Sequence, residues 1–439
     1  MKQQAPATTG PVGIAIVFVL ALNLRPAVTS LGAALEDISA TPGMTAAVGA
    51  VLVAIPLWAS GLGGWVTPWL RSRLGIHKAV TWALLMLGAS LVVRVQGGPS
   101  VLLAGTALAC LAIAVVGTVL PVLVQSASSR TRASYTFALG SGSTIGALAT
   151  PTLVGAVNWE FALASWALLA LVTVWLWQGA ARSSMVFKAS SMSPTRLFRC
   201  AVSWNLTVYF GLVSTLTFLV MGWLPGILRD AGVSASTAGF CLALCMAMGL
   251  PMMWLVPFLV QRGRNQSLVV ILLASSNAIG VVGLMVAPAS VPWLWSVGLG
   301  IGMGGLAMAL CSISERSGGS PDLATALSGM VQGLGYIIAG IGALACGLIH
   351  SSTGGWLAPL AMCLAVLCGQ VWCGIHAGRP YIVRATPLPV VPRKVRPLPI
   401  VPLGEPAVQA IQQVVQPVIP QPRKPILPLI PTEQATEAT

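Results

Sequence analysis

Residues 12–35 read VGIAIVFVLALNLRPAVTSLGAAL, an apolar run with a single charge, Arg25, near its middle. A helix of this length can cross a bilayer. A charge at the centre of a span costs roughly 2.5 kcal/mol or more, so it normally faces a cavity or a partner. Pro26 has no N–H, so the carbonyl of Leu22 loses its helical partner. The stretch predicts a membrane span weakened at its centre, beside a fixed positive charge.

Two roles fit such an arginine. A charge beside an interrupted helix at mid-membrane depth is typical of a substrate site in a transporter. Alternatively, the guanidinium bonds backbone carbonyls and joins two helices. No Asp, Glu or His lies at mid-depth in any apolar run. Arg25 therefore has no carboxylate partner at its depth, and an anionic substrate would neutralise it.

The composition places the whole chain in a membrane. Of its 439 residues, 56% are hydrophobic and 7% are charged, too few charges to cover the surface of a soluble protein of this length. The nine cysteines form no CxxC pair or metal-ligand spacing, and no nucleotide-binding motif occurs, so we expect no metal and no cofactor. Without acidic groups at mid-depth to move protons, we do not expect an enzyme.

Twelve apolar runs predict twelve membrane-spanning helices in an all-α protein. Short breaks at 97–99 and 288–292 divide the third run from the fourth and the ninth from the tenth. The runs cover about residues 12–35, 45–70, 79–96, 100–125, 133–157, 160–180, 201–228, 235–260, 267–288, 291–314, 323–349 and 356–377.

The net charge of +14 comes from basic residues in short segments between these runs and in the tail. Nearly all fall on one side of the predicted membrane, which is typical of cytoplasmic loops and not of a nucleic-acid-binding surface. The sorting predicts that both termini are cytoplasmic. Acidic residues such as Asp37 and Asp230 are expected near the outer ends.

A short pattern recurs in the two halves of the chain. PWLRSR at 68–73 and PFLVQR at 257–262 close the second and eighth runs, and Glu36-Asp37 and Arg229-Asp230 follow the first and seventh. Two six-span halves are the plan of a two-bundle secondary transporter. The predicted parts are an N-terminal bundle (1–180), a cytoplasmic linker loop (181–200), a C-terminal bundle (201–378) and a disordered Pro-rich basic tail (379–439).

Few polar side chains remain at the depth of Arg25. Gln332 and Tyr336 lie four residues apart and share one face of the eleventh span. Such residues either contact a small polar substrate or bond their own and neighbouring helices. The candidates for substrate binding are Arg25, Asn23, Thr29, Gln332, Tyr336 and Ser214. The candidates for gating or close helix packing are Pro26, Gly142, Gly146, Gly329 and Gly333.

The motif NLRP at 23–26, followed by Thr29-Ser30, resembles the start of the cyanate-permease and 2-nitroimidazole-transporter branch of the major facilitator superfamily. The resemblance continues through PWLRSRLG at 68–75 and is strongest in LSGMVQGLGY at 327–336. It implies a twelve-helix fold of two pseudo-symmetric bundles that moves small molecules across a bacterial inner membrane by alternating access. Val213 stands where many relatives have glutamine, and a tyrosine of the family is replaced near Leu139.

The sequence thus predicts a secondary active or facilitative transporter for a small anion or small polar molecule, cyanate-like, with Arg25 as the binding charge. One alternative is a drug or nitroheterocycle exporter of the same fold. Another is a non-transporting membrane sensor that signals through its tail. The expected partners are a small-molecule substrate and membrane lipids, with no nucleic acid, and the protein is expected to be a monomer. The tail either binds a proline-recognising partner or has no essential role.

Overall fold

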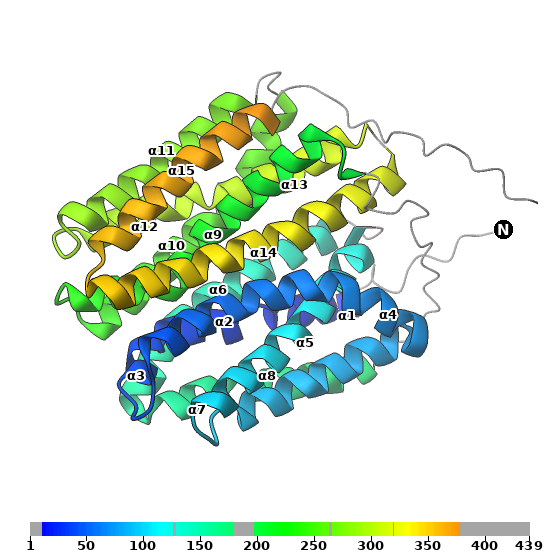
Figure 1. Cartoon of the computed structure of the whole chain (residues 1–439). Coiled ribbons are helices and arrows are strands. Elements are labelled where there is room, and N and C mark those ends of the chain that lie inside the picture. The colour runs from blue at the N-terminus through cyan, green and yellow to red at the C-terminus, as the bar shows by residue number, and fades with distance from the viewer. Residues whose placement is uncertain (1–10, 126–128, 180–196, 263–265, 319, 378–439) are drawn as a thin grey trace, which may run out of the picture. The chain divides into compact units, whose positions relative to one another are not determined.

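The computed structural model describes residues 11–125, 129–179, 197–262, 266–318 and 320–377 (Figure 1). The chain divides into two units, Met1–Thr386 and Pro387–Thr439. The second unit, the whole predicted tail and most of the predicted linker loop lie outside the described residues. The predicted boundaries of the two bundles therefore stay predictions.

The described residues form helices joined by short turns. Twelve stretches of these helices are long and apolar enough to cross a membrane, which confirms the predicted number and the two breaks at 97–99 and 288–292. The helices are α1 (Pro11–Leu22), α2 (Pro26–Ala33), α3 (Leu35–Ser39), α4 (Ala46–Val93), α5 (Pro99–Gln125), α6 (Ser129–Ala156), α7 (Trp159–Ala164), α8 (Trp166–Gln178), α9 (Ala201–Asp230), α10 (Ala235–Arg262), α11 (Ser267–Val286), α12 (Pro292–Gly302), α13 (Gly304–Arg316), α14 (Pro321–Thr353) and α15 (Leu357–Ala377).

The second and third spans are joined without a loop, within the single helical element α4. Gly75 turns the chain between them at φ 75° and ψ 164°, a conformation that residues with a Cβ rarely adopt. Span ten is divided into two helical elements. The helix is interrupted at Met303, between α12 and α13.

The most extensive contacts between the first half of the chain and the second are those of α4 with α14 and of α6 with α10 (Figure 1), and α2 also packs against α9. Small residues allow the close approach of α4 and α14. A Cβ on Gly61 would lie 3.1 Å from the carbonyl oxygen of Gly333, and a Cβ on Gly340 would overlap the indole of Trp58. A packing role for Gly333 itself stays a prediction, because this contact involves only its backbone carbonyl.

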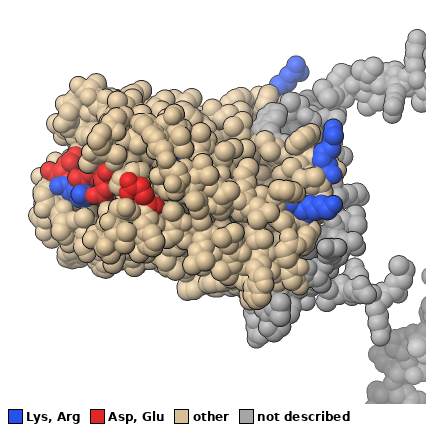
Figure 2. Space-filling model, turned by 90° about the horizontal axis from the view of Figure 1, so that it is seen from below, with Lys and Arg blue, Asp and Glu red and all other residues tan. Residues whose placement is uncertain are grey.

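Charged side chains separate toward the two ends of the described unit (Figure 2). We call the end that holds Glu36, Asp37, Arg229 and Asp230 the carboxylate end. We call the opposite end, where α4 turns at Gly75 and α10 finishes, the basic end. The span centres, including the break between α1 and α2, lie between these ends.

Candidate substrate-binding site

The first span is broken at its centre, as Pro26 predicts. α1 finishes at Leu22 and α2 begins at Pro26. The carbonyl of Arg25 then accepts hydrogen bonds from the N–H groups of Val28 and Thr29, each at 3.1 Å, and from Thr29 Oγ1 at 3.1 Å. The side chain of Arg25 is half-buried. The break thus presents a cation at mid-span while its own backbone remains bonded.

Two glycines of α6 bring that helix directly against the break. A Cβ on Gly142 would lie 2.8 Å from the carbonyl oxygen of Leu22 and 3.5 Å from the Cβ of Arg25. A Cβ on Gly146 would overlap Thr29 Oγ1 and lie 2.9 Å from the Cα of Pro26. The pair predicted for close packing therefore lies against the wall of the candidate site.

Gly146→Ala is expected to lower the stability of the folded protein by about 1–3 kcal/mol, because α6 must move away from Thr29 and Pro26. Gly155→Ala in the same helix is the matched control, since a Cβ there meets nothing within 4 Å. Thermal unfolding in detergent measures both. Equal stability of the two variants would contradict the close contact.

Two tyrosines, one from each half of the chain, interact with the positive charge of Arg25. Tyr135 of α6 and Tyr336 of α14 each interact electrostatically with it. The ring of Tyr336 is held edge-on by Phe210 and Phe218, with centroid distances of 5.1 and 6.5 Å. Both tyrosines are half-buried. One hydrogen-bonding side chain from each half therefore lies near one cation.

The sequence interpretation missed Tyr135. It noted that a tyrosine of the family is replaced near Leu139, which lies one helical turn further along α6. Tyr135 precedes Gly142 by seven residues, or two turns, so both lie on one face of the helix. The spacing of Tyr135, Gly142 and Gly146 is the signal that could have found it.

Gln332 lies one turn before Tyr336 on α14, as predicted. Its Nε2 donates to Ser328 Oγ at 2.6 Å, and its side chain is half-buried. This bond orients the amide within the helix and leaves Oε1 as an acceptor and one amide hydrogen as a donor. Gly329 lies on the same helix, between Ser328 and Gln332.

The other three predicted substrate contacts are fully buried. Asn23 Nδ2 donates to Val19 O of α1 at 2.9 Å and to Thr173 Oγ1 of α8 at 2.5 Å, so one amide hydrogen bonds the preceding helix and the other joins this segment to α8. Thr29 Oγ1 bonds backbone carbonyls of the break. Ser214 Oγ has no hydrogen-bond partner in the described structure. A substrate role for these three residues stays a prediction.

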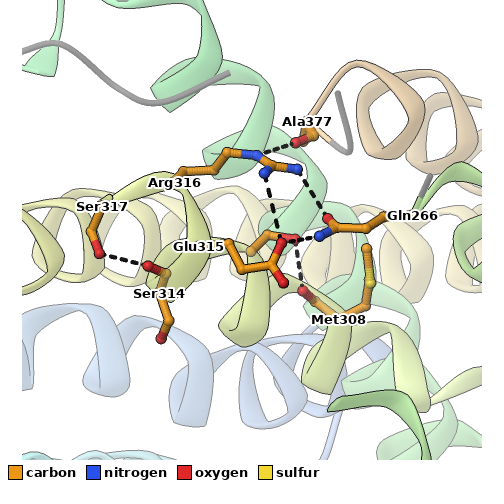
Figure 3. Close-up of polar contacts among 8 residues, drawn as sticks. Gln266, Met308, Ser314, Glu315, Arg316, Ser317 and Ala377 are labelled. Atoms are coloured by element: carbon orange, nitrogen blue, oxygen red, sulfur yellow. Dashed lines mark hydrogen bonds and ion pairs between the residues drawn. The ribbon is translucent and has the colours of Figure 1, made fainter. Parts of the chain in front are cut away.

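Two arginines are fully buried in the described part of the chain, and both have protein partners. At the basic end, Arg316 donates from Nε to Ala377 O and from Nη2 to Gln266 Oε1, both at 3.0 Å (Figure 3). Its Nη1 lies 3.7 Å from Glu315 Oε2. Arg94 donates to Leu163 O at 3.3 Å. None of the ion pairs in the described part of the chain includes Arg25.

Solved transporters share this arrangement of helices. The chain matches the structure of the nucleoside transporter NupG with a TM-score of 0.67 and 11% identity, covering 83% of this chain and 99% of that one. It matches a D-xylose–proton symporter with a TM-score of 0.65 and 12% identity, covering 85% and 98%. The fold is that of a twelve-helix membrane transporter.

Proteins with similar sequences identify the family of transporters. The chain is 32% identical over 382 residues to an uncharacterised transporter, YycB, of Bacillus subtilis strain 168, covering 83% of this chain and 92% of the relative. It is 30% identical over 350 residues to the cyanate transport protein CynX of Escherichia coli K12 (78% and 91%). It is 28% identical over 380 residues to the 2-nitroimidazole transporter of the same strain (84% and 96%). No family model matches the chain. The chain belongs to the major facilitator superfamily, in the branch of the cyanate and 2-nitroimidazole transporters.

Proposed function

We propose that the protein is a monomeric secondary transporter that moves a small anion across a bacterial inner membrane by alternating access. The observation that supports it most is the surroundings of Arg25. This cation lies at the break in the first span and interacts electrostatically with one tyrosine from each half. It takes part in none of the ion pairs of the described residues. The relative named as a cyanate transport protein agrees with a small anionic substrate.

In this proposal the anion neutralises Arg25 through charge-assisted hydrogen bonds. Tyr135 and Tyr336 donate their hydroxyl hydrogens to the remaining lone pairs of the anion. Because one tyrosine comes from each half, a bound anion links the halves and favours a conformation in which both contact it. Alternating access needs such a difference in affinity between conformations.

A nitroheterocycle is the second candidate substrate. The rings of Phe210 and Phe218 pack against Tyr336, which interacts electrostatically with Arg25, and the three form an aromatic cluster. A flat neutral ring could contact this cluster while its nitro oxygens accept hydrogen bonds from the guanidinium. The relative named as a 2-nitroimidazole transporter agrees with this alternative.

Flux of labelled solutes into proteoliposomes that contain the purified protein tests the proposal. Small monovalent anions, cyanate among them, should enter faster than in protein-free liposomes and should compete with one another. Faster flux of 2-nitroimidazole than of every anion would favour the second candidate. Thermal stabilisation by a solute without any flux would contradict transport and favour a sensor.

We further propose that the basic end and both termini face the cytoplasm, following the charge sorting. A membrane-impermeant maleimide applied to sealed right-side-out vesicles should label Ala40→Cys near the carboxylate end but not Ser72→Cys near the basic end. Both positions are exposed. Labelling of the parent protein gives the background from its nine native cysteines. The reverse pattern would overturn the orientation.

A further inference from the structure

Three charged side chains at the carboxylate end join the two halves of the chain. Arg229, in the last turn of α9, donates from Nη1 to Asp37 Oδ2 at 3.0 Å. Its Nε lies 2.8 Å from Glu36 Oε2. Both acids belong to α3, in the first half. We call Glu36, Asp37 and Arg229 the charged latch, because this end cannot open without separating them.

Tight backbone packing lies next to the charged latch. A Cβ on Gly32 of α2 would overlap the carbonyl oxygen of Met221 of α9. A Cβ on Gly222 would lie 2.6 Å from Val53 Cγ1 of α4. The two halves are therefore in direct contact at this end, and the charged latch joins them while they are closed.

The internal repeat explains why these residues meet. Glu36-Asp37 and Arg229-Asp230 follow the first and seventh spans and so occupy corresponding places in the two halves. Corresponding places that meet across a pseudo-two-fold axis would bring like charges together if both halves carried the same residues. Arg229 prevents this. Asp230 instead accepts a hydrogen bond from Trp356 Nε1 at 2.6 Å.

The two acids of the latch are not equivalent. Asp37 accepts a hydrogen bond from Arg229, whereas Glu36 Oε2 is buried and makes only an ion contact with Arg229 that lacks hydrogen-bond geometry, although the Glu36 side chain as a whole is 39% exposed. Burial raises the pKa of the Glu36 carboxyl, Arg229 lowers it by less, and Asp230 and Asp37 raise it further. The charged form of Glu36 is thus disfavoured in the closed arrangement.

We propose that Asp37 and Arg229 hold the carboxylate end closed, whereas Glu36 opposes closure while it is charged. The charged groups that face Glu36 are Arg229 and Asp230 of α9 and Asp37 of its own helix. When this end opens, water solvates Glu36 and its pKa returns towards the ordinary value. Closure therefore takes up a proton, and acid favours the closed state. That contribution is lost as the pH rises through the raised pKa.

The isosteric neutralisations Asp37→Asn and Glu36→Gln, at adjacent positions, test the inference. Ser30→Cys serves as the reporter, because Ser30 is fully buried in α2, between the latch and Arg25. Labelling by a membrane-impermeant maleimide is followed in sealed right-side-out and inside-out vesicles, so the result does not depend on the proposed orientation. The protein without the reporter gives the background.

Asp37→Asn should raise the labelling rate of the reporter roughly fivefold to tenfold, because the hydrogen bond between the halves loses its negatively charged acceptor. Glu36→Gln should leave the rate unchanged or lower it. In the protein with the reporter alone, acid should slow labelling of the reporter relative to a free thiol at the same pH. Glu36→Gln should abolish this slowing. Equal acceleration by both variants, or by neither, would overturn the proposal.

The exchange of charges, Asp37→Arg with Arg229→Asp, keeps the test decisive if a single variant fails to fold. If Asp37→Asn is poorly folded, Arg229→Gln should open the same end and the exchanged pair should restore slow labelling. Fast labelling of the exchanged pair at normal membrane abundance would also overturn the proposal. None of these readouts requires the substrate to be known.

Discussion

Arg25→Ala is expected to lower uptake at least tenfold while the protein still inserts and folds. A charge-assisted hydrogen bond contributes on the order of 1.5–3 kcal/mol, and each 1.4 kcal/mol is about tenfold in affinity. Folding should survive, because the substitution removes a charge that the bilayer disfavours. Initial uptake rates in proteoliposomes, at equal amounts of reconstituted protein, measure the effect.

Arg25→Lys should also be impaired, because an ammonium group cannot present the planar, bidentate donors of a guanidinium. Lys78→Ala is a suitable control, since it removes an exposed cation near the basic end, away from the site. Wild-type uptake by both Arg25 variants would exclude Arg25 as a substrate ligand. Failure of both to fold would instead support the structural role, in which Arg25 joins helices.

Loss of both phenol hydroxyls beside Arg25 should reduce uptake about fivefold to a hundredfold, because each neutral hydrogen bond contributes roughly 0.5–1.5 kcal/mol. Tyr135→Phe and Tyr336→Phe should each have a smaller effect than Arg25→Ala. Their combination should exceed either alone. The concentration dependence of uptake should show weaker apparent binding, since the rings and their packing remain.

Tyr209→Phe is the matched control for these two substitutions. The Tyr209 hydroxyl is buried in α9 and has no hydrogen-bond partner among the described residues, so its removal should leave uptake and stability nearly unchanged. A loss of uptake in Tyr209→Phe as large as in the double variant would show that the effect is not specific to the site.

The spans and the break in the first span could be predicted because each depends on local sequence. Apolar length identifies a span, and Pro26 removes a hydrogen bond from its own helix whatever surrounds it. The grouping of Gln332 with Tyr336 likewise follows from helical spacing. These features need no knowledge of which helices become neighbours.

Contacts between distant segments could not be read in the same way. Asn23 has the polarity and depth of a substrate ligand, yet its partner is Thr173, 150 residues away. Tyr135 approaches Arg25 only because Gly142 and Gly146 let α6 pack against the break. Glu36-Asp37 and Arg229-Asp230 were recognised as repeated positions, but their pairing depends on how the two halves meet.

The charge imbalance at the carboxylate end affects how solutes approach the protein. Glu36 and Asp37 share the guanidinium of Arg229 there, and a third carboxylate, Asp230, lies near Glu36 and bonds Trp356 instead. The resulting negative potential repels anions and slows their diffusional encounter with the carboxylate end. The arginines and lysines of the basic end attract anions. An anion would therefore be captured faster from the basic side, and added salt would shrink that difference by screening. The binding equilibrium at Arg25 would be unchanged. The two sides of the membrane would differ only in the rate at which an anion reaches the protein.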